Sequence, residues 1–239
     1  MKKPNREKNI SFRVHSVLKK YKIDATLKGI ETLSKTVQNI IEFNQKLYDI
    51  GTLDGVSLAT SIEDLIEIFM LRSKVYKEIG YSGEFPEIIK GLDFDEYDEY
   101  SAIVYSKKEG KITGTCRLIF DSEKKLPIEQ KFSIDYLREQ NLNLAEASRV
   151  IIRNNSGLKV EFKLLTIDSY RVLNAYNLDA ISAMTQEHIK LYQNFGGLSV
   201  EKKITNYGGI KKEFFLTLWR TKEISPFFKR VFLRNLKVS

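Results

Sequence analysis

Three short segments place charged side chains beside or inside apolar runs that are typical of β-strands. They span Asp93–Asp98, Gly114–Ile119 and Ala145–Ile152. Burying an unpaired charge costs several kcal/mol, so these carboxylates and arginines should pair with each other or with a ligand. A carboxylate in such a place can accept a proton, and a guanidinium can bind a carboxylate through two hydrogen bonds. We therefore expect the functional site here.

The elements that must hold these segments follow from hydrophobic spacing and turn residues. The pattern predicts an α/β or α+β domain, with helices on a mixed, mostly antiparallel sheet. Ser61 is the expected N-cap of the first core helix. The expected helices are 27–48, a segment from Ser61 to about Gly80, 128–137, 159–176 and 186–195, and the expected strands are 100–105, 111–120, 145–152, 178–184, 200–204 and 213–219.

Charge is unevenly distributed along the 239 residues, whose net charge is +8. The net charge is +5 over residues 1–58, −5 over 59–150 and +8 over 151–239. We expect a helical extension over 1–58, a catalytic domain over 59–222 and a basic, aromatic tail over 223–239. The acidic middle and the basic last third suggest faces with different partners.

Several classes of function lack their sequence signatures. The two histidines lie far apart without metal-spaced partners, so no metal site is expected, and no nucleotide-binding loop, hydrolase elbow or RNA-binding aromatic motif is present. No run approaches 18 apolar residues. The single Cys116 fits a reducing compartment, and we expect a small buried side chain there. The expectation is a cytoplasmic protein that does not bind nucleic acid.

Four motifs in order resemble two related families of acyltransferase. They are Arg72-x-x-x-Tyr76, Asp95-Glu96-Tyr97-Asp98, Gly114-Thr115-Cys116-Arg117-Leu118 and Glu146-Ala147-Ser148-Arg149. This stretch is similar to the acyl-homoserine lactone (autoinducer) synthases and the N-acyl amino acid synthases, both of the GNAT acyltransferase fold. The Leu144-Ala145-Glu146 form, without the tryptophan usual in autoinducer synthases, fits the N-acyl amino acid synthases better.

The resemblance also implies the acyl donor. Coenzyme-A-using GNAT enzymes carry a Q/R-x-x-G-x-G/A loop that wraps a pyrophosphate, whereas Arg153–Leu158 is degenerate. This favours an acyl-phosphopantetheine on acyl carrier protein over coenzyme A, with no tightly bound cofactor. Carrier proteins are acidic, so basic residues of the last third would steer docking: Lys159, Lys163, Arg171, Lys190, Lys202 and Lys203.

The resemblance assigns roles to individual residues. Glu146 is the first candidate for general base and Asp98 the second, while Arg149 would tune the pKa of Glu146. Asp95 could hold the acceptor's ammonium group, and a carboxylate on the acceptor could bind Arg72, Arg117 or Arg149. The donor would enter where two strands splay, near Val150–Arg153 and Leu178–Ser182. A backbone N–H near Val150 or Ile151 would stabilise the oxyanion, Ile152 and Arg153 would bind the donor, and Tyr76 would line an acyl pocket.

Alternatives remain open at this stage. Glu146–Arg149 and Asp98–Arg117 could be purely structural ion pairs. The predicted function is transfer of a fatty acyl group from acyl carrier protein to the amine of an amino acid. The alternatives are an autoinducer synthase that uses S-adenosylmethionine, and a non-catalytic binding module on the same scaffold. The tail could contact a membrane surface or pack on its own domain.

Overall fold

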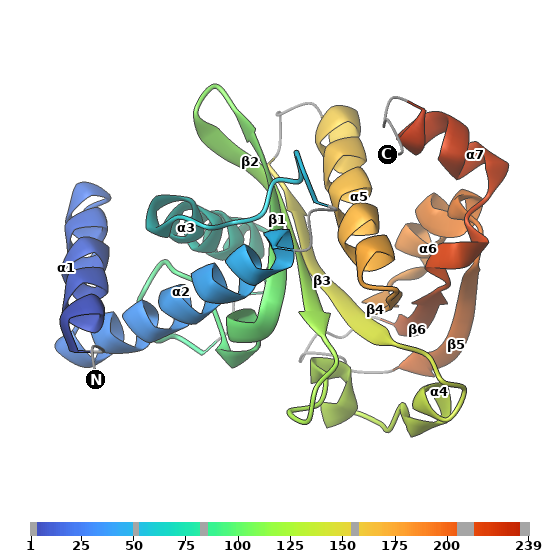
Figure 1. The fold of residues 1–239 in the computed structure, drawn as a ribbon, viewed down its shortest axis with the longest axis horizontal. Helices are drawn as coiled ribbons and strands as arrows, with labels where there is room; N and C mark the ends of the chain where they lie inside the picture. Colours follow the sequence, from blue (N-terminus) through green and yellow to red (C-terminus); the bar gives the residue numbers. More distant parts are fainter. Residues whose placement is uncertain (1–3, 50–52, 82–85, 154–157, 205–212, 235–239) are drawn as a thin grey trace.

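A computed structural model describes residues 4–49, 53–81, 86–153, 158–204 and 213–234. Its centre is one six-stranded sheet in the order β1-β2-β3-β4-β6-β5 (Figure 1). All neighbouring strands are antiparallel except β3 and β4, which are parallel. The predicted mixed, mostly antiparallel sheet is confirmed. The strands are β1 (Ser101–Lys108), β2 (Lys111–Phe120), β3 (Leu144–Ile152), β4 (Asp179–Met184), β5 (Leu198–Ile204) and β6 (Phe214–Trp219).

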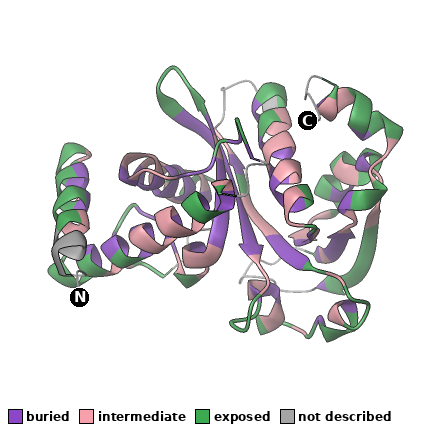
Figure 2. Ribbon diagram, in the orientation of Figure 1, coloured by how far each residue is buried: buried purple, intermediate pink, exposed green. Residues whose placement is uncertain are grey.

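Helices cover both faces of the sheet (Figures 1 and 2). Side chains alternate between the faces along a strand. Ala102 and Val104 pack in one cluster with α5, whereas Ile103 packs in another with the first three helices. The helices are α1 (Pro4–Lys20), α2 (Leu27–Tyr48), α3 (Ile62–Glu78), α4 (Asp135–Arg138), α5 (Leu158–Ala175), α6 (Gln186–Tyr192) and α7 (Pro226–Phe228).

The amino-terminal helices are joined to the first edge of the sheet. The carboxamide of Asn44 on α2 donates to the carbonyl of Ser101 and accepts from the N–H of Ile103. The segment after α2 continues this cover, because Ala59 N–H donates to Ile103 O and Tyr105 N–H donates to Ser57 O. These bonds satisfy backbone groups of β1 that an edge strand otherwise exposes.

Local sequence explains where elements begin and turn. The Ser61 hydroxyl accepts from Asp64 N–H at 3.1 Å, which confirms the predicted N-cap of α3. The turn between β1 and β2 is shorter than predicted. It consists of Glu109 and Gly110, both at positive φ, because a two-residue turn of this kind matches the twist of its strands.

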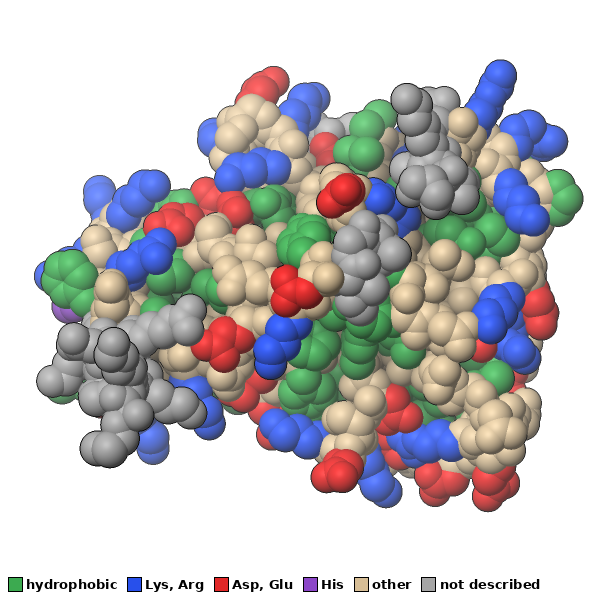
Figure 3. Space-filling model, in the orientation of Figure 1, with side chains coloured by type: hydrophobic (Ala, Val, Ile, Leu, Met, Phe, Trp, Pro, Cys, Tyr) green, Lys and Arg blue, Asp and Glu red, His purple; other side chains and the backbone are tan. Residues whose placement is uncertain are grey.

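Two predicted segments differ from the structure. The predicted helix 128–137 is two short pieces, a 3₁₀ helix at Pro127–Gln130 and α4; between them the Ser133 hydroxyl accepts from Asp135 N–H, the first residue of α4. The tail contains α7 and a π-helical turn at Lys229–Leu233. Its Phe228 and Phe232 are buried against Phe195, whereas Lys229 and Arg230 are exposed. Figure 3 shows Lys and Arg side chains on the surface in the region of α7. Packing on its own domain therefore uses much of the tail's apolar surface.

Candidate active site

The parallel strands β3 and β4 pair only at one end. Leu144, Ala145 and Glu146 lie opposite Asp179, Ala180 and Ile181, and beyond this point the strands separate. β3 continues to Ile152 against β2, and β4 continues to Met184 against β6. The predicted splay is therefore present on β3, but on β4 it begins at Ser182 rather than at Leu178.

Two cavities meet at this splay. The larger, about 470 Å³, lies between α5 and the sheet and has a mainly apolar lining. The smaller, about 130 Å³, contains Glu146 and Arg117. By strand alternation these two side chains lie on the sheet face opposite α5. Both cavities are lined by Tyr76, Tyr81, Ala147, Ser148, Arg149, Ala183 and Phe214.

A β-bulge on β3 shapes the junction of the cavities. Arg117 pairs with Ser148 and Thr115 with Ile151, so Arg149 and Val150 together face the single residue Cys116. Arg149 has φ +56°, in the left-handed region that disfavours residues with a Cβ. The extra residue bends the strand and redirects its side chains next to the site.

The bulge makes an unusual prediction for Arg149. Arg149→Gly and Arg149→Ala lose the same contacts, but glycine adopts positive φ without the Cβ penalty, so it should be more stable than alanine by about 1 kcal/mol. Urea unfolding of both variants measures the difference. The same pair at Val150, which has no positive φ, is the control, and there alanine should be the more stable. Equal stabilities at Arg149 would contradict the strained backbone.

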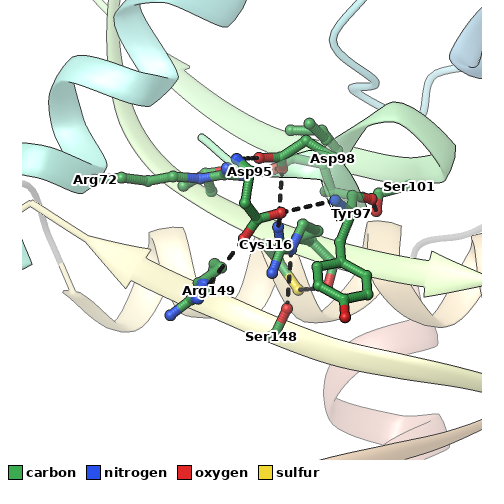
Figure 4. A network of polar contacts seen from close by, with 12 residues as sticks. Arg72, Asp95, Tyr97, Asp98, Ser101, Cys116, Ser148 and Arg149 are labelled. Carbon is green, nitrogen blue, oxygen red and sulfur yellow. Dashed lines mark hydrogen bonds and ion pairs between the residues drawn. The ribbon is translucent and has the colours of Figure 1, made fainter. Parts of the chain in front are cut away.

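A buried network joins all four motifs (Figure 4). Arg72 Nη1 lies 2.8 Å from Asp98 Oδ1, and Arg117 Nη1 lies 2.6 Å from Asp95 Oδ1 and 3.3 Å from Asp98 Oδ1. Arg117 Nε also donates to Ser148 Oγ. Asp95 and Asp98 form a capping box on the 3₁₀ helix Glu96–Tyr100, which fixes both carboxylates.

This network separates the predicted site residues into two groups. The side chains of Arg72 and Asp98 are wholly buried and line neither cavity, and they contact each other. Burial opposes ionisation of Asp98, but Arg72 and Arg117 lower its pKa, so it stays a carboxylate. The predicted ion pair Asp98–Arg117 is present, whereas Arg117 itself lines the smaller cavity.

Glu146 differs from the other carboxylates because it is buried yet lines a cavity. It is 1% exposed, and its Oε2 accepts the N–H of Ile128 at 2.9 Å. Burial raises its pKa to about 7, although the Ile128 N–H, Arg117 and Arg149 act in the opposite direction. A carboxylate with this pKa can take a proton from a substrate near neutral pH.

Arg149 is the most accessible of the three site arginines. Its side chain is 15% exposed and lines both cavities. Nη1 donates to the hydroxyl of Tyr76 at 3.1 Å, the guanidinium lies over the Tyr76 ring, and Nη2 is 3.8 Å from Asp95 Oδ2. These contacts aim the cation at the junction, where a substrate anion could reach it.

The open edge of β3 supplies backbone groups. Val150, Ile151 and Ile152 line the larger cavity, as expected for donor-binding residues. Arg153 N–H donates to Thr113 O, toward β2. Because N–H directions alternate along a strand, the amide of Ile152 faces the splay and that of Ile151 faces β2. Val150 and Ile152 are thus better placed than Ile151 to donate to an oxyanion. Residues 154–157 of the degenerate loop lie outside the described residues.

The lining also includes residues that the sequence did not indicate. His188 on α6 lines the larger cavity, and its Nδ1 is 3.2 Å from Thr185 Oγ1. Cys116 is buried as predicted, but it is also part of this lining. α5 also contributes to this lining, through Phe162, Leu165, Thr166, Ser169 and Leu173. Their helical spacing on one face of α5 is the sequence signal that could have indicated them.

The described part of the chain offers neither a metal site nor a membrane-spanning helix. It contains no cluster of three or more His, Cys, Asp or Glu side chains suited to a metal ion. Within the same residues, no helix combines the length and the apolar character needed to cross a membrane.

Comparison with solved structures places the fold. FeeM, described as an N-acyl amino acid synthase from uncultured soil microbes, is 14% identical with a TM-score of 0.59, covering 70% of this chain and 91% of its own. BjaI and MesI, described as CoA-dependent acyl-homoserine lactone synthases, have TM-scores of 0.52 and 0.51. Their identities are 14% and 13%, and the coverage is 72% and 77% of this chain and 82% and 86% of theirs. No curated protein sequence matches.

The splayed sheet and a family match over residues 67–218 together define an acyltransferase. The family model described as "N-acyl amino acid synthase FeeM" matches residues 67–218. The chain belongs to this family, which confirms the resemblance carried by the four motifs.

Proposed function

We propose that the enzyme transfers a fatty acyl group from acyl carrier protein to the amine of an amino acid. One observation carries the proposal: two cavities on opposite faces of the sheet meet at the splay, and the smaller contains a buried carboxyl with a raised pKa. The larger, apolar cavity suits an acyl chain, and the smaller, polar one suits the head of an amino acid.

Each group at the junction has a proposed role. Arg149 binds the acceptor's carboxylate, and Asp95 holds Arg149 and Arg117 in place. The neutral amine nitrogen attacks the thioester carbon while Glu146 accepts a proton from that nitrogen. The backbone N–H of Val150 or Ile152 stabilises the oxyanion. The C–S bond then breaks, an amide forms, and the proton passes from Glu146 to the thiolate. Asp98 and Arg72 act as positioning residues.

Charge around the larger cavity favours a carrier protein as donor. The first turn of α5 carries the acidic residue Glu161, which is 4% exposed, and an acidic side chain there disfavours the pyrophosphate that coenzyme A would bring. Lys159 and Lys190 are exposed on α5 and α6, near the larger cavity. Other predicted docking residues are engaged elsewhere: Arg171 donates to Asp54 O, and Lys203 pairs with Glu213.

Charge reversal tests the docking surface. Lys159→Glu with Lys163→Glu should raise KM for acyl carrier protein roughly tenfold, because a basic surface steers an acidic partner. KM for the small pantetheine thioester should not change. Lys203→Glu on β5, where the native lysine already pairs with Glu213, is the matched control and should leave both values unaltered. An unchanged KM for the carrier-bound donor would remove these lysines from the docking surface.

The proposed base predicts the pH dependence. Only ionised Glu146 can accept the amine proton, so kcat/KM should rise as pH increases through about 7. A pH–rate profile with a saturating amine measures this, and the rise should disappear in Glu146→Gln. A wild-type profile that is flat from about pH 5.5 to about pH 8.5 would argue against Glu146 as the base.

Mass spectrometry of lipid extracts from overexpressing cells tests the reaction itself. N-acyl amino acids should accumulate with the wild-type protein and not with Glu146→Ala. Homoserine lactones instead would show an autoinducer synthase, and no acylated amine from either protein would favour a non-catalytic binding module. Purified enzyme with acyl carrier protein and mixed amino acids provides the second, cell-free measurement.

A further inference from the structure

The larger cavity contains a polar spot within its apolar lining. α5 lines the cavity from Phe162 to Leu173, a rise of about 16 Å. Four of the uncharged polar groups in this lining are the hydroxyls of Thr166 and Ser169 on α5, the Cys116 thiol on β2 and the Tyr192 phenol on α6. We call these four groups the hydroxyl pocket. An alkyl chain would leave their hydrogen-bonding capacity unused.

Ser169 is the key member of the hydroxyl pocket. It is 8% exposed, and its Oγ makes no hydrogen bond to a nitrogen or oxygen atom of the described residues; the Cys116 thiol beside it is a weak partner. A buried helical serine can instead donate to the carbonyl one turn back, as Ser34 does to Ile30 O at 2.6 Å. An unpaired buried hydroxyl costs about 1–3 kcal/mol, so its presence in this lining calls for an explanation.

The other members show which chemistry would match Ser169. Burial raises the pKa of the Cys116 thiol to about 11 against the opposing effect of the adjacent Ser169 hydroxyl, so the thiol stays protonated. Burial also raises the pKa of Tyr192. The pocket therefore presents neutral donors and acceptors. The basic side chains in the described lining are Arg149, at the splay, and the exposed His188. A neutral oxygen fits these groups, whereas a carboxylate would have no cation beside it.

We propose that the hydroxyl pocket binds a hydroxyl group on the acyl chain, so that hydroxyacyl thioesters are the preferred donors. The proposal rests on the function proposed above and specifies its donor. A hydroxyl can accept from Ser169 and donate to a neighbouring oxygen at the same time, which satisfies both partners inside an apolar cavity. A plain alkyl chain of the same length fills the cavity but leaves Ser169 with only the weakly hydrogen-bonding Cys116 thiol beside it.

Purified full-length enzyme, with pantetheine thioesters of one chain length and mixed amino acids, tests this. One donor is unsubstituted, and the others carry a single hydroxyl moved along the chain. For at least one position, wild-type kcat/KM should exceed that of the unsubstituted donor by roughly tenfold, the value of one well-formed hydrogen bond. Ser169→Ala should bring the ratio between the hydroxylated and the unsubstituted donor, both measured on that variant, close to one. Ser34→Ala, remote from the cavity, should keep the wild-type ratio.

The possible failures are distinguishable. If the wild type prefers no hydroxylated donor, or if Ser169→Ala retains the preference, the proposed hydroxyl pocket is wrong. Ser169 then has a structural role or binds water. If no donor yields an acylated amino acid, the proposed function itself fails. Thermal unfolding without donor shows whether Ser169→Ala has a folding defect. The variant removes a buried hydroxyl whose neighbour is a weakly bonding thiol, so its melting temperature should be no lower than that of the wild type.

Discussion

Replacing Glu146 with glutamine is expected to lower kcat/KM for amide formation by roughly 100- to 10,000-fold, the usual contribution of a general base. Glutamine keeps the size of the side chain and can still accept from the N–H of Ile128, but it cannot take a proton from the amine. Steady-state rates with carrier-bound donor measure the effect. Glu129→Gln is a matched control, since that carboxylate lies outside both cavities and pairs with Arg138.

Stability should respond to Glu146→Gln in the opposite direction from activity. The folded-state pKa of Glu146 is raised to about 7 from an ordinary 4.5. The folded protein therefore binds the proton more tightly, and stability falls as pH rises from about 4.5 to about 7. Above that window the ionised group costs about 3 kcal/mol, which glutamine removes. A variant that is inactive and clearly less stable at pH 8 would indicate a structural role instead.

The second large effect is expected at Asp98. Asp98→Ala should lower the free energy of unfolding by about 3–5 kcal/mol, because it leaves the wholly buried Arg72 without its carboxylate. The variant also removes a contact of Arg117 and the acceptor for the Asp95 N–H. Urea unfolding followed by circular dichroism measures the loss. Arg72→Met should cost less, since Asp98 then keeps Arg117 as its partner.

An exposed ion pair gives the matched control for Asp98. Arg13 and Glu63 are 3.9 Å apart with side chains about half exposed. Glu63→Ala should therefore change the free energy of unfolding by about 1 kcal/mol or less. If Asp98→Ala were as mild as Glu63→Ala, the buried network would not hold the fold together, and its residues would be free for a catalytic assignment.

The core elements were predictable because their hydrophobic periods are regular. β2 (111–120) and α2 (27–48) have the predicted bounds. The sequence did not specify α1. Its buried apolar residues, Val14, Val17 and Leu18, are few among polar ones, and the helix gains its stability from packing on α2 and α3. The tail was ambiguous for a related reason, because only tertiary contact with Phe195 decides where Phe228 and Phe232 lie.

The site was predictable as a set of residues but not as an arrangement. Three arginines were equivalent in sequence as partners for a carboxylate. Burial on α3 makes Arg72 part of the network, and the bulge places Arg149 at the junction of the cavities. Neither burial nor a bulge can be read from spacing. Ser169 was overlooked because one serine in an amphipathic helix acquires meaning only when its partners, or their absence in the described residues, are known.

The cover over β1 has a consequence for the order in which the molecule is assembled. Asn44 bonds to Ser101 and Ile103, which lie 57 and 59 residues later in the chain. During synthesis the amino-terminal helices leave the ribosome before β1 exists, so the buried carboxamide of Asn44 must stay hydrated until the first strand arrives. The helices therefore cannot complete their packing as an independent early unit. Packing of these helices on the sheet is therefore completed only when the first hairpin docks onto them.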